Sequence, residues 1–128
     1  MIVDTSAAVA MLRAEPEAAR MLWALEDAPI ARMSAATVLE LSLVTAASGP
    51  ELVDDFLADM GIQVVPVDLE HLRWARQAHV RFGRGSGSPA RLNYGDCFAY
   101  GAAMVFGEPL LFKGEDFVHT DVEAAALA

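Results

Sequence analysis

The sequence predicts an α/β fold of three layers, in which helices cover both faces of a central, mostly parallel sheet. Short apolar runs alternate with longer segments of helical periodicity, an order that is typical of parallel sheets. Hydrophobic residues make up 55% of the 128 residues, which is enough for a core without disulfides or other cross-links. We expect a single domain that spans residues 1–128.

The first part of the chain predicts two strands with two helices between them. Residues 2–3 form a very short apolar strand, and residues 30–33 are expected to form the second strand. Helices are predicted from about residues 6–13 and 16–27. Pro16 suits the first turn of the second helix, where no backbone N–H is needed.

The middle of the chain predicts two more helices and a third strand. A helix begins after Ser34, a favourable N-cap, and is stopped near residue 47 by a Gly-Pro pair. The next helix covers residues 51–60 and ends at Gly61. The run IQVVPV, residues 62–67, then forms the third strand.

The last part of the chain contains the one clearly flexible loop, GRGSGSPARL, which is rich in Gly and Ser. The coarse order of elements over the whole chain is β-α-α-β-α-α-β-α-α-β. The remaining predicted elements are a helix opened by Asp68 over residues 68–82, a helix over 93–106, a strand over 109–112, and an edge strand in the tail from Phe117.

The chain is strongly acidic, with 18 Asp and Glu against 9 Lys and Arg and a formal charge of −9. A nucleic-acid-binding protein usually carries a basic surface, so this balance argues against one. The objection loses its force if some of the acids hold cations. The single cysteine, Cys97, excludes an intramolecular disulfide and a cysteine-based zinc site, and we expect it to be a buried, inert thiol.

Targeting and membrane signals are not apparent. No apolar run reaches the roughly 20 residues that span a bilayer. The start, MIVDTSAAV, has no basic segment before its apolar residues, so it does not resemble a signal peptide. We therefore expect a cytoplasmic protein without a membrane partner.

Two acids follow predicted strands. Asp4 comes after the first strand, and Asp116, in LLFKGEDF, comes after the last. In open parallel sheets, ligand sites lie outside the carboxyl ends of the strands. The alternative for Asp4 is a simple N-cap of the following helix, and on Asp4 alone that alternative would be preferred.

Glu40 lies on an apolar arc of its predicted helix. We expect this arc to face the core, where a carboxylate is costly unless it is paired or bound to a cation. The alternative is a Glu at the edge of the core with its head in water. On a helical wheel the arc consists, in angular order, of Leu39, Leu43, Ala36, Glu40 and Val44, with Ser42 and Thr45 opposite.

Asp96 stands at the head of the apolar stretch NYGDCFAYG. Asn93, three residues earlier, forms an N-x-x-D capping pattern with it, and an acid in the first turn suits the helix dipole. The helix that follows is apolar on all sides, so its N-terminus is expected near the middle of the fold. Asp96 is therefore either a helix cap or a functional carboxylate, and the sequence leaves both interpretations open.

Asp4, Glu40, Asp96 and Asp116 map to the same rim of the predicted sheet. Carboxylates this close repel one another and raise each other's pKa unless a divalent cation neutralises them. Ligands that are all oxygen favour Mg²⁺, with Mn²⁺ as a substitute. Such a centre suits phosphoryl transfer to water, in which the metal activates water and stabilises the leaving oxygen.

The motifs in this order resemble those of PIN-domain ribonucleases and, more narrowly, the VapC toxins of bacterial toxin–antitoxin pairs. The resemblance covers nearly the whole chain. MIVDTSA is similar to the opening motif, with Asp4 as first metal ligand and Ser6 as a supporting hydroxyl. SAATVLEL, with Glu40, is similar to the second motif, and NYGDCFAYGAA, with Asp96, to the third.

The last motif, LLFKGEDF, departs from the family pattern. Family members often read Thr-x-Asp-x-Asp-Phe, whereas this chain has Phe112 and Gly114 at the Thr and first Asp positions. Asp116 takes the role of fourth acid by position, with Glu115 as a substitute.

The resemblance implies the PIN-like fold and a Mg²⁺-dependent endoribonuclease toxin that acts on tRNA or rRNA. It also implies a 3′-hydroxyl and a 5′-phosphate as products, a homodimer, and a VapB-type antitoxin that plugs the acidic site with a basic side chain. The antitoxin groove would use the apolar faces of the first two helices. The candidate groove residues are Met11, Leu12, Met21, Leu22 and Leu25, and the candidate RNA contacts are Arg13, Arg84, Arg91 and Lys113.

Other functions remain open at this stage. One is a catalytically silent protein with the same fold and a partner groove. Another is a phosphatase or phospho-acceptor domain on a different doubly wound sheet. The residues after Asp4 argue against this function, because they are Thr-Ser and do not form an Asp-x-Asp pattern. A third, metal-free cleavage by histidines, is disfavoured because His71 and His79 are expected on the surface. Trp23 and Trp74 are expected to pack and not to stack on bases.

Overall fold

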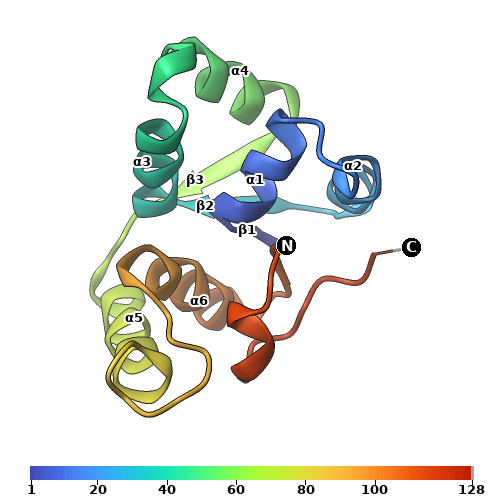
Figure 1. Cartoon of the computed structure of the whole chain (residues 1–128). Coiled ribbons are helices and arrows are strands. Elements are labelled where there is room, and N and C mark those ends of the chain that lie inside the picture. Colours follow the sequence, from blue (N-terminus) through green and yellow to red (C-terminus); the bar gives the residue numbers. More distant parts are fainter. Residues whose placement is uncertain (128) are drawn as a thin grey trace.

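A parallel sheet of four short strands lies at the centre of the computed structural model, which describes residues 1–127 (Figure 1). The order of these strands is β3-β2-β1-β4, and each neighbouring pair is parallel, as predicted. Ile2 of β1 lies opposite Arg32 on one side and Leu110 on the other. The strands are β1 (Ile2–Val3), β2 (Ala31–Ser34), β3 (Ile62–Val65) and β4 (Leu110–Leu111).

Helices cover both faces of the sheet, and the predicted order of elements is confirmed (Figure 1). One face carries α1 (Thr5–Leu12), α2 (Ala18–Asp27), α3 (Ala35–Val44) and α4 (Glu51–Asp59). The other face carries α5 (Leu69–Phe82) and α6 (Tyr94–Phe106). Each face has its own apolar cluster, because alternate residues of the strands point to opposite sides.

Local capping sets the starts of the helices. The side chains of Ser34, Asp68 and Asn93 accept hydrogen bonds from the backbones of α3, α5 and α6 at 3.3, 2.9 and 2.8 Å. These bonds satisfy N–H groups that the first turn of a helix leaves without partners. Gly107 ends α6 with a φ of 62°, a conformation that glycine adopts without strain.

The second predicted helix starts at Ala18 with Glu17 as its N-cap, so Pro16 precedes the helix and is not in its first turn as predicted. Two other predicted elements end differently. The helix after Ser34 stops at Val44 and is followed by a separate 3₁₀ turn, Ala46–Ser48, because the Thr45 hydroxyl donates to the Leu41 carbonyl (2.8 Å) at the break. The predicted edge strand from Phe117 is wrong. The tail forms a 3₁₀ turn, η2 (Asp116–His119), that buries Phe117, and it then pairs with β4 only at a single bridge.

The expectation that the apolar arc of α3 faces the core is also wrong. Leu39 and Leu43 are 62% and 69% exposed, whereas Thr37, Leu41 and Thr45 are buried. The sequence of α3 is apolar on nearly every side, so periodicity could not set its orientation. The outer side of α3 is therefore an exposed apolar surface.

His71 is buried, contrary to the prediction that it lies on the surface. Its ring lies between α5 and α6, where Nε2 is 2.9 Å from the Phe98 carbonyl and Nδ1 is 3.4 Å from that of Pro66. Gly101 leaves space for the ring, since a Cβ there would collide with it. His79 and Cys97 lie where they were expected, on the surface and in the core.

The predicted groove on the first two helices is occupied by the protein's own core. Met11, Met21 and Leu25 are buried in the cluster beneath α1–α4, and Leu12 and Leu22 pack against it. Trp23 is exposed, contrary to expectation, whereas Trp74 packs against the other cluster. Within residues 1–127, no helix combines the length and the apolar character that a membrane span requires.

Candidate active site

Asp4 lies at the carboxyl end of β1 and is only 3% exposed. Its backbone N–H donates to the carbonyl of Leu111 in β4 (3.0 Å). Its Oδ2 accepts hydrogen bonds from the N–H and the hydroxyl of Ser6, at 3.0 and 2.6 Å. Its Oδ1 is buried and has no partner among the described residues. Burial raises the pKa of Asp4, and the charge of Glu40 adds to that effect. Asp4 therefore caps α1 and still holds one oxygen unpaired.

Glu40 reaches from α3 to the residues that flank Asp4 and Asp96. Its Oε1 accepts a hydrogen bond from the hydroxyl of Thr5, the residue after Asp4. Its carboxylate also lies against Gly95, the residue before Asp96, because a Cβ at Gly95 would overlap it. Glu40 is half-buried and points into the fold while its neighbours on the arc face solvent.

Asp96 is both a helix cap and a member of an acidic group. Its N–H donates to Asn93 Oδ1 (2.8 Å), and its Oδ2 accepts from the Asn93 N–H (3.0 Å), which completes the predicted capping box. Burial, together with the charges of Asp4, Asp116 and Glu40, raises the pKa of Asp96 to about 6. The two interpretations of Asp96 are therefore compatible.

Asp116 starts η2 and is exposed. Phe117, next to it, is buried and fixes the turn in place. Asp116 is one of the acids whose charge raises the pKa of Asp96. Asp116 therefore acts electrostatically on the start of α6.

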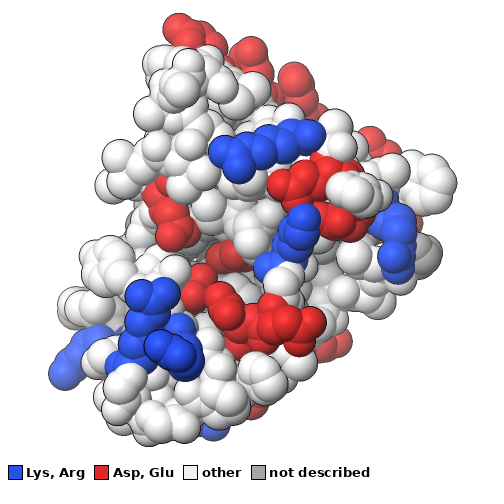
Figure 2. All heavy atoms as spheres, viewed as in Figure 1, with Lys and Arg blue, Asp and Glu red and all other residues white. Residues whose placement is uncertain are grey.

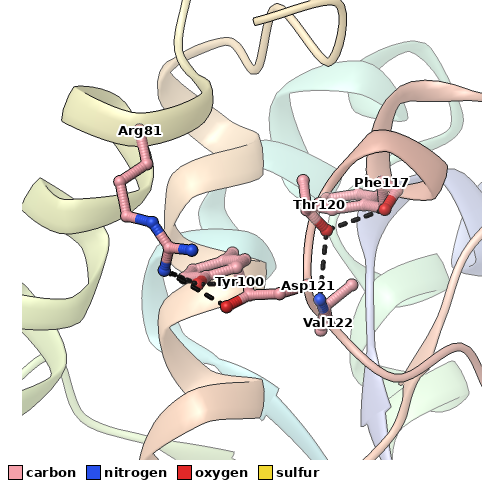
Figure 3. Close-up of polar contacts among 6 residues, drawn as sticks. All are labelled: Arg81, Tyr100, Phe117, Thr120, Asp121 and Val122. Carbon is pink, nitrogen blue, oxygen red and sulfur yellow. Dashed lines mark hydrogen bonds and ion pairs between the residues drawn. The ribbon is translucent and has the colours of Figure 1, made fainter.

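A partly exposed polar network holds the segment that follows Asp116 (Figure 3). The hydroxyl of Tyr100, on α6, donates to Asp121 Oδ1 (2.6 Å), and Arg81, on α5, donates to Asp121 Oδ2 (3.1 Å). Thr120 closes the turn with a hydrogen bond to the Phe117 carbonyl (2.7 Å). Burial, together with the bond to Asp121, raises the pKa of Tyr100, which therefore stays a hydrogen-bond donor.

Ser6 connects the first motif with the last. Its Oγ donates to Asp4 and accepts a hydrogen bond from the backbone N–H of Lys113 (2.9 Å). The Lys113 ammonium group pairs with Glu15 and Glu17, the latter at 2.6 Å. Lys113 thus already has carboxylate partners, which makes it a weaker candidate for an RNA contact.

The four predicted acids come from four elements and converge on one region. Figure 2 shows Asp and Glu side chains around a hollow near the middle of this face, with Lys and Arg side chains at its margins. Within residues 1–127, no three side chains of His, Cys, Asp or Glu are grouped closely enough to hold one ion as they stand. Their charges nevertheless act on one another, as the raised pKa values of Asp4 and Asp96 indicate.

The other predicted RNA contacts lie on the surface. Arg13 is exposed at the end of α1, and Arg84 and Arg91 are exposed in the loop between α5 and α6. Arg91 has a φ of 49°, an uncommon conformation for a residue other than glycine.

Sequence reasoning missed several residues that position the acids. Thr5 holds Glu40, Gly95 leaves room for its carboxylate, and Tyr100 with Asp121 fixes the last segment. Gly95, directly before Asp96, carried a usable signal because a helical glycine often marks a close approach. The partnership of Tyr100 and Asp121 links distant segments, and no local pattern indicates it.

The family model of the PIN domain matches residues 1–123 of the chain. Ribonuclease VapC42 of Mycobacterium tuberculosis is 51% identical over 129 residues, which cover 98% of each chain. Ribonuclease VapC28 of the same organism is 45% identical and covers 98% of this chain and 97% of its own. This match excludes the alternative of a phosphatase on a different doubly wound sheet.

Solved structures share the fold at low sequence identity. The VapC20 toxin of M. tuberculosis, described as cleaving the sarcin–ricin loop, has a TM-score of 0.75 at 17% identity and covers 99% of this chain and 98% of its own. A toxin–antitoxin complex from Klebsiella pneumoniae has a TM-score of 0.72 at 14% identity, with 94% and 92% covered. The chain therefore belongs to the PIN-domain family, and the curated relatives named above are VapC ribonucleases.

Proposed function

We propose that this protein is a metal-dependent endoribonuclease toxin. The observation that carries the proposal is the group of Asp4, Glu40, Asp96 and Asp116, whose charges act on one another at the carboxyl ends of β1 and β4 and at the start of α6. The curated relatives, at up to 51% identity over nearly the whole chain, are named ribonucleases. Together these findings support hydrolysis of RNA phosphodiester bonds.

The donor set fits a hard divalent cation such as Mg²⁺, or Mn²⁺ in its place. All four side chains offer oxygen, and the buried Asp4 Oδ1 has no partner among the described residues. Burial and mutual repulsion raise the pKa of Asp96 to about 6, a cost that a cation would remove. Such an ion would activate water and stabilise the charge that develops on the leaving oxygen.

The protein's own residues would position this chemistry. Ser6 holds the Asp4 carboxylate by two hydrogen bonds, and Thr5 holds that of Glu40. The capping box fixes Asp96 at the start of α6, where the helix dipole also attracts a substrate phosphate. Binding an ion would require the carboxylates to turn toward one another, since no three of the described ones are grouped as they stand.

Mapping of RNA ends after brief induction tests the activity in cells. We expect new 5′-phosphate and 3′-hydroxyl ends at a small number of positions in tRNA or rRNA. The matched control is induction of Asp4→Asn, in which Asn retains the N-cap role. The absence of new ends, with a harmless wild-type protein, would support the alternative of a catalytically silent PIN protein.

A VapB-type antitoxin is the partner that we propose for the acidic site. A basic side chain of such a protein would meet the unpaired Asp4 Oδ1 and the Asp96 carboxylate. Its apolar contacts would use exposed side chains such as Trp23, because Met11, Met21 and Leu25 belong to the core. Co-purification with the product of a neighbouring small gene tests this, and replacement of its basic residue should restore nuclease activity more than it weakens binding.

We also propose a homodimer. α3 and the start of α5 lie on the same side of the molecule (Figure 1), and exposed apolar side chains occur on α3, on β3 and on the segment from β3 to the start of α5. An exposed patch of this kind usually marks an interface. Leu39→Asp should yield a monomer by light scattering while the wild type is a dimer. The patch consists of Leu39, Leu43, Val44, Val64, Val67 and Leu69.

A further inference from the structure

The basic residues of this acidic chain are concentrated in one segment. Residues 71–95 contain five of the nine Lys and Arg residues and no Asp or Glu. The rest of the chain has four basic and 18 acidic residues, so its formal charge is −14 against +5 for the segment. The segment comprises most of α5, the loop and the start of α6, and its basic residues are Arg73, Arg76, Arg81, Arg84 and Arg91.

The same segment lines a hollow with a volume of about 980 Å³. We call this hollow the basic groove, and its lining includes Arg73, Arg76, Arg84, Leu92, Tyr94 and Phe98. Figure 2 shows Lys and Arg side chains gathered over α5 and the following loop, beside the acidic hollow. The groove therefore adjoins the candidate active site and has the opposite charge.

An exposed aromatic ring stands where the groove meets the acidic site. Tyr94 is 83% exposed and lies two residues before Asp96. Its ring packs edge-on against Phe98, with the ring centroids 5.0 Å apart. An aromatic ring that is held at one edge and open to solvent offers a face on which an unpaired base can stack.

The arginines of the groove are available to a ligand. Within residues 1–127, Arg73, Arg76 and Arg84 form no ion pair, whereas Arg81 pairs with Asp121. Arg73 lies near the ring of Trp74, at 5.7 Å from its centroid. A guanidinium group binds a phosphate through two parallel hydrogen bonds, so charge complementarity favours a polyanion as the ligand.

We propose that the basic groove binds the single-stranded RNA segment on one side of the scissile phosphate. Arg73, Arg76 and Arg84 contact its phosphates, and Tyr94 stacks on an unpaired base. RNA has a phosphate at every nucleotide, so one strand can place phosphates in the groove and its scissile phosphate at the neighbouring acidic site. An acidic peptide could bind the arginines but has no phosphodiester for that site. Duplex RNA supplies phosphates but no free base face for Tyr94. This inference rests on the proposed nuclease function and names its substrate class.

Binding of a fluorescent, unstructured RNA oligonucleotide to the full-length protein in EDTA tests the proposal without cleavage. Tyr94→Ala should weaken binding about 5- to 100-fold, and Tyr94→Phe should restore it, because the ring and not the hydroxyl stacks. Trp23→Ala, the matched control at another exposed aromatic residue, should leave the affinity unchanged. The duplex form of the same RNA should bind more weakly and should not respond to Tyr94→Ala.

Salt dependence tests the arginines. The double variant Arg76→Ala/Arg84→Ala should reduce the slope of log affinity against log salt by about 1.4, because each phosphate contact on a single strand contributes about 0.7. Arg20→Ala/Arg32→Ala removes the same charge at residues outside the groove that are not candidate RNA contacts, and it should change the slope less. Circular dichroism melts confirm that each variant is folded.

Three results would overturn the inference. The first is an RNA affinity that Tyr94→Ala leaves equal to that of the wild type. The second is an equal slope of log affinity against log salt for the two double variants. The third is a changed oligomeric state of the groove variants with an unchanged RNA affinity. The proposed nuclease function fails separately, if wild-type protein binds the RNA as described but never cleaves it with Mg²⁺.

Discussion

Asp96→Asn should stabilise the metal-free protein at neutral pH. Burial and the charges of three other acids raise the pKa of Asp96 from 3.8 to about 6. That shift corresponds to about 3 kcal/mol, and solvent screening of a partly exposed carboxylate reduces it to about 1–2 kcal/mol. The variant loses the attraction between charge and helix dipole, about 0.3–1 kcal/mol, but keeps an oxygen for the Asn93 N–H. The expected net gain is about 1 kcal/mol.

The effect has a defined pH window. The folded pKa of Asp96 is raised, so its contribution to the free energy of unfolding is fully present below the unfolded pKa of about 4. It is lost as the pH rises through about 6. The advantage of Asp96→Asn should therefore vanish near pH 4, and it should be largest above about pH 6.

Thermal melts at several pH values, with and without Mg²⁺, measure both effects. A gain of 1 kcal/mol corresponds to a rise in Tm of about 3–6 °C for a domain of this size. Mg²⁺ should raise the Tm of the wild type more than that of Asp96→Asn, because it binds the native cluster and not the unfolded chain. Asp54→Asn, in the exposed first turn of α4, is the matched control and should not alter the response to Mg²⁺.

A destabilised Asp96→Asn variant at neutral pH, together with a wild-type Tm that ignores Mg²⁺, would refute this reasoning. Asp96 would then be a helix cap only, and the acids would not form a cluster.

Three further substitutions test the supports of the acidic site. Gly95→Ala should keep or slightly raise the Tm, because alanine favours helices by up to about 1 kcal/mol relative to glycine. Its Cβ should displace the Glu40 carboxylate, so RNA cleavage should fall at least about tenfold. Unchanged cleavage would contradict the placement of Glu40. Thr5→Val should reduce cleavage by releasing Glu40, and a rate equal to that of the wild type would show that the hydrogen bond is dispensable. Tyr100→Phe should lower the free energy of unfolding by about 1 kcal/mol and weaken the stabilisation by Mg²⁺, since Asp121 then keeps only its bond to Arg81 and holds the segment after Asp116 less firmly. Melts with and without Mg²⁺ that match the wild type would exclude this role.

The order of elements and the starts of α3, α5 and α6 could be predicted because their signals are local. Ser34, Asp68 and Asn93 cap helices with their own side chains, and the apolar runs between them match the strands. The positions of Asp4 and Asp116 after β1 and β4 followed from the same local patterns. Capping residues and strand ends depend on a few neighbouring residues, which the sequence displays directly.

The orientation of side chains across the fold could not be predicted in the same way. α3 is apolar on almost every side, so only its packing against α1 and α6 decides that Leu41 is buried and Leu39 exposed. His71 belongs to a charged helix, but its own position faces the space that Gly101 leaves in α6. These outcomes depend on contacts between distant segments, which carry no local pattern.

Cleavage of RNA by purified, metal-depleted protein tests the central claim most directly. We expect no hydrolysis in EDTA, recovery when Mg²⁺ or Mn²⁺ is added, and no recovery in Asp4→Asn. The Asn side chain preserves the cap of α1, so loss of activity in a folded variant would reflect the lost carboxylate. Full cleavage in EDTA, or in folded Asp4→Asn, would contradict a metal centre built on Asp4.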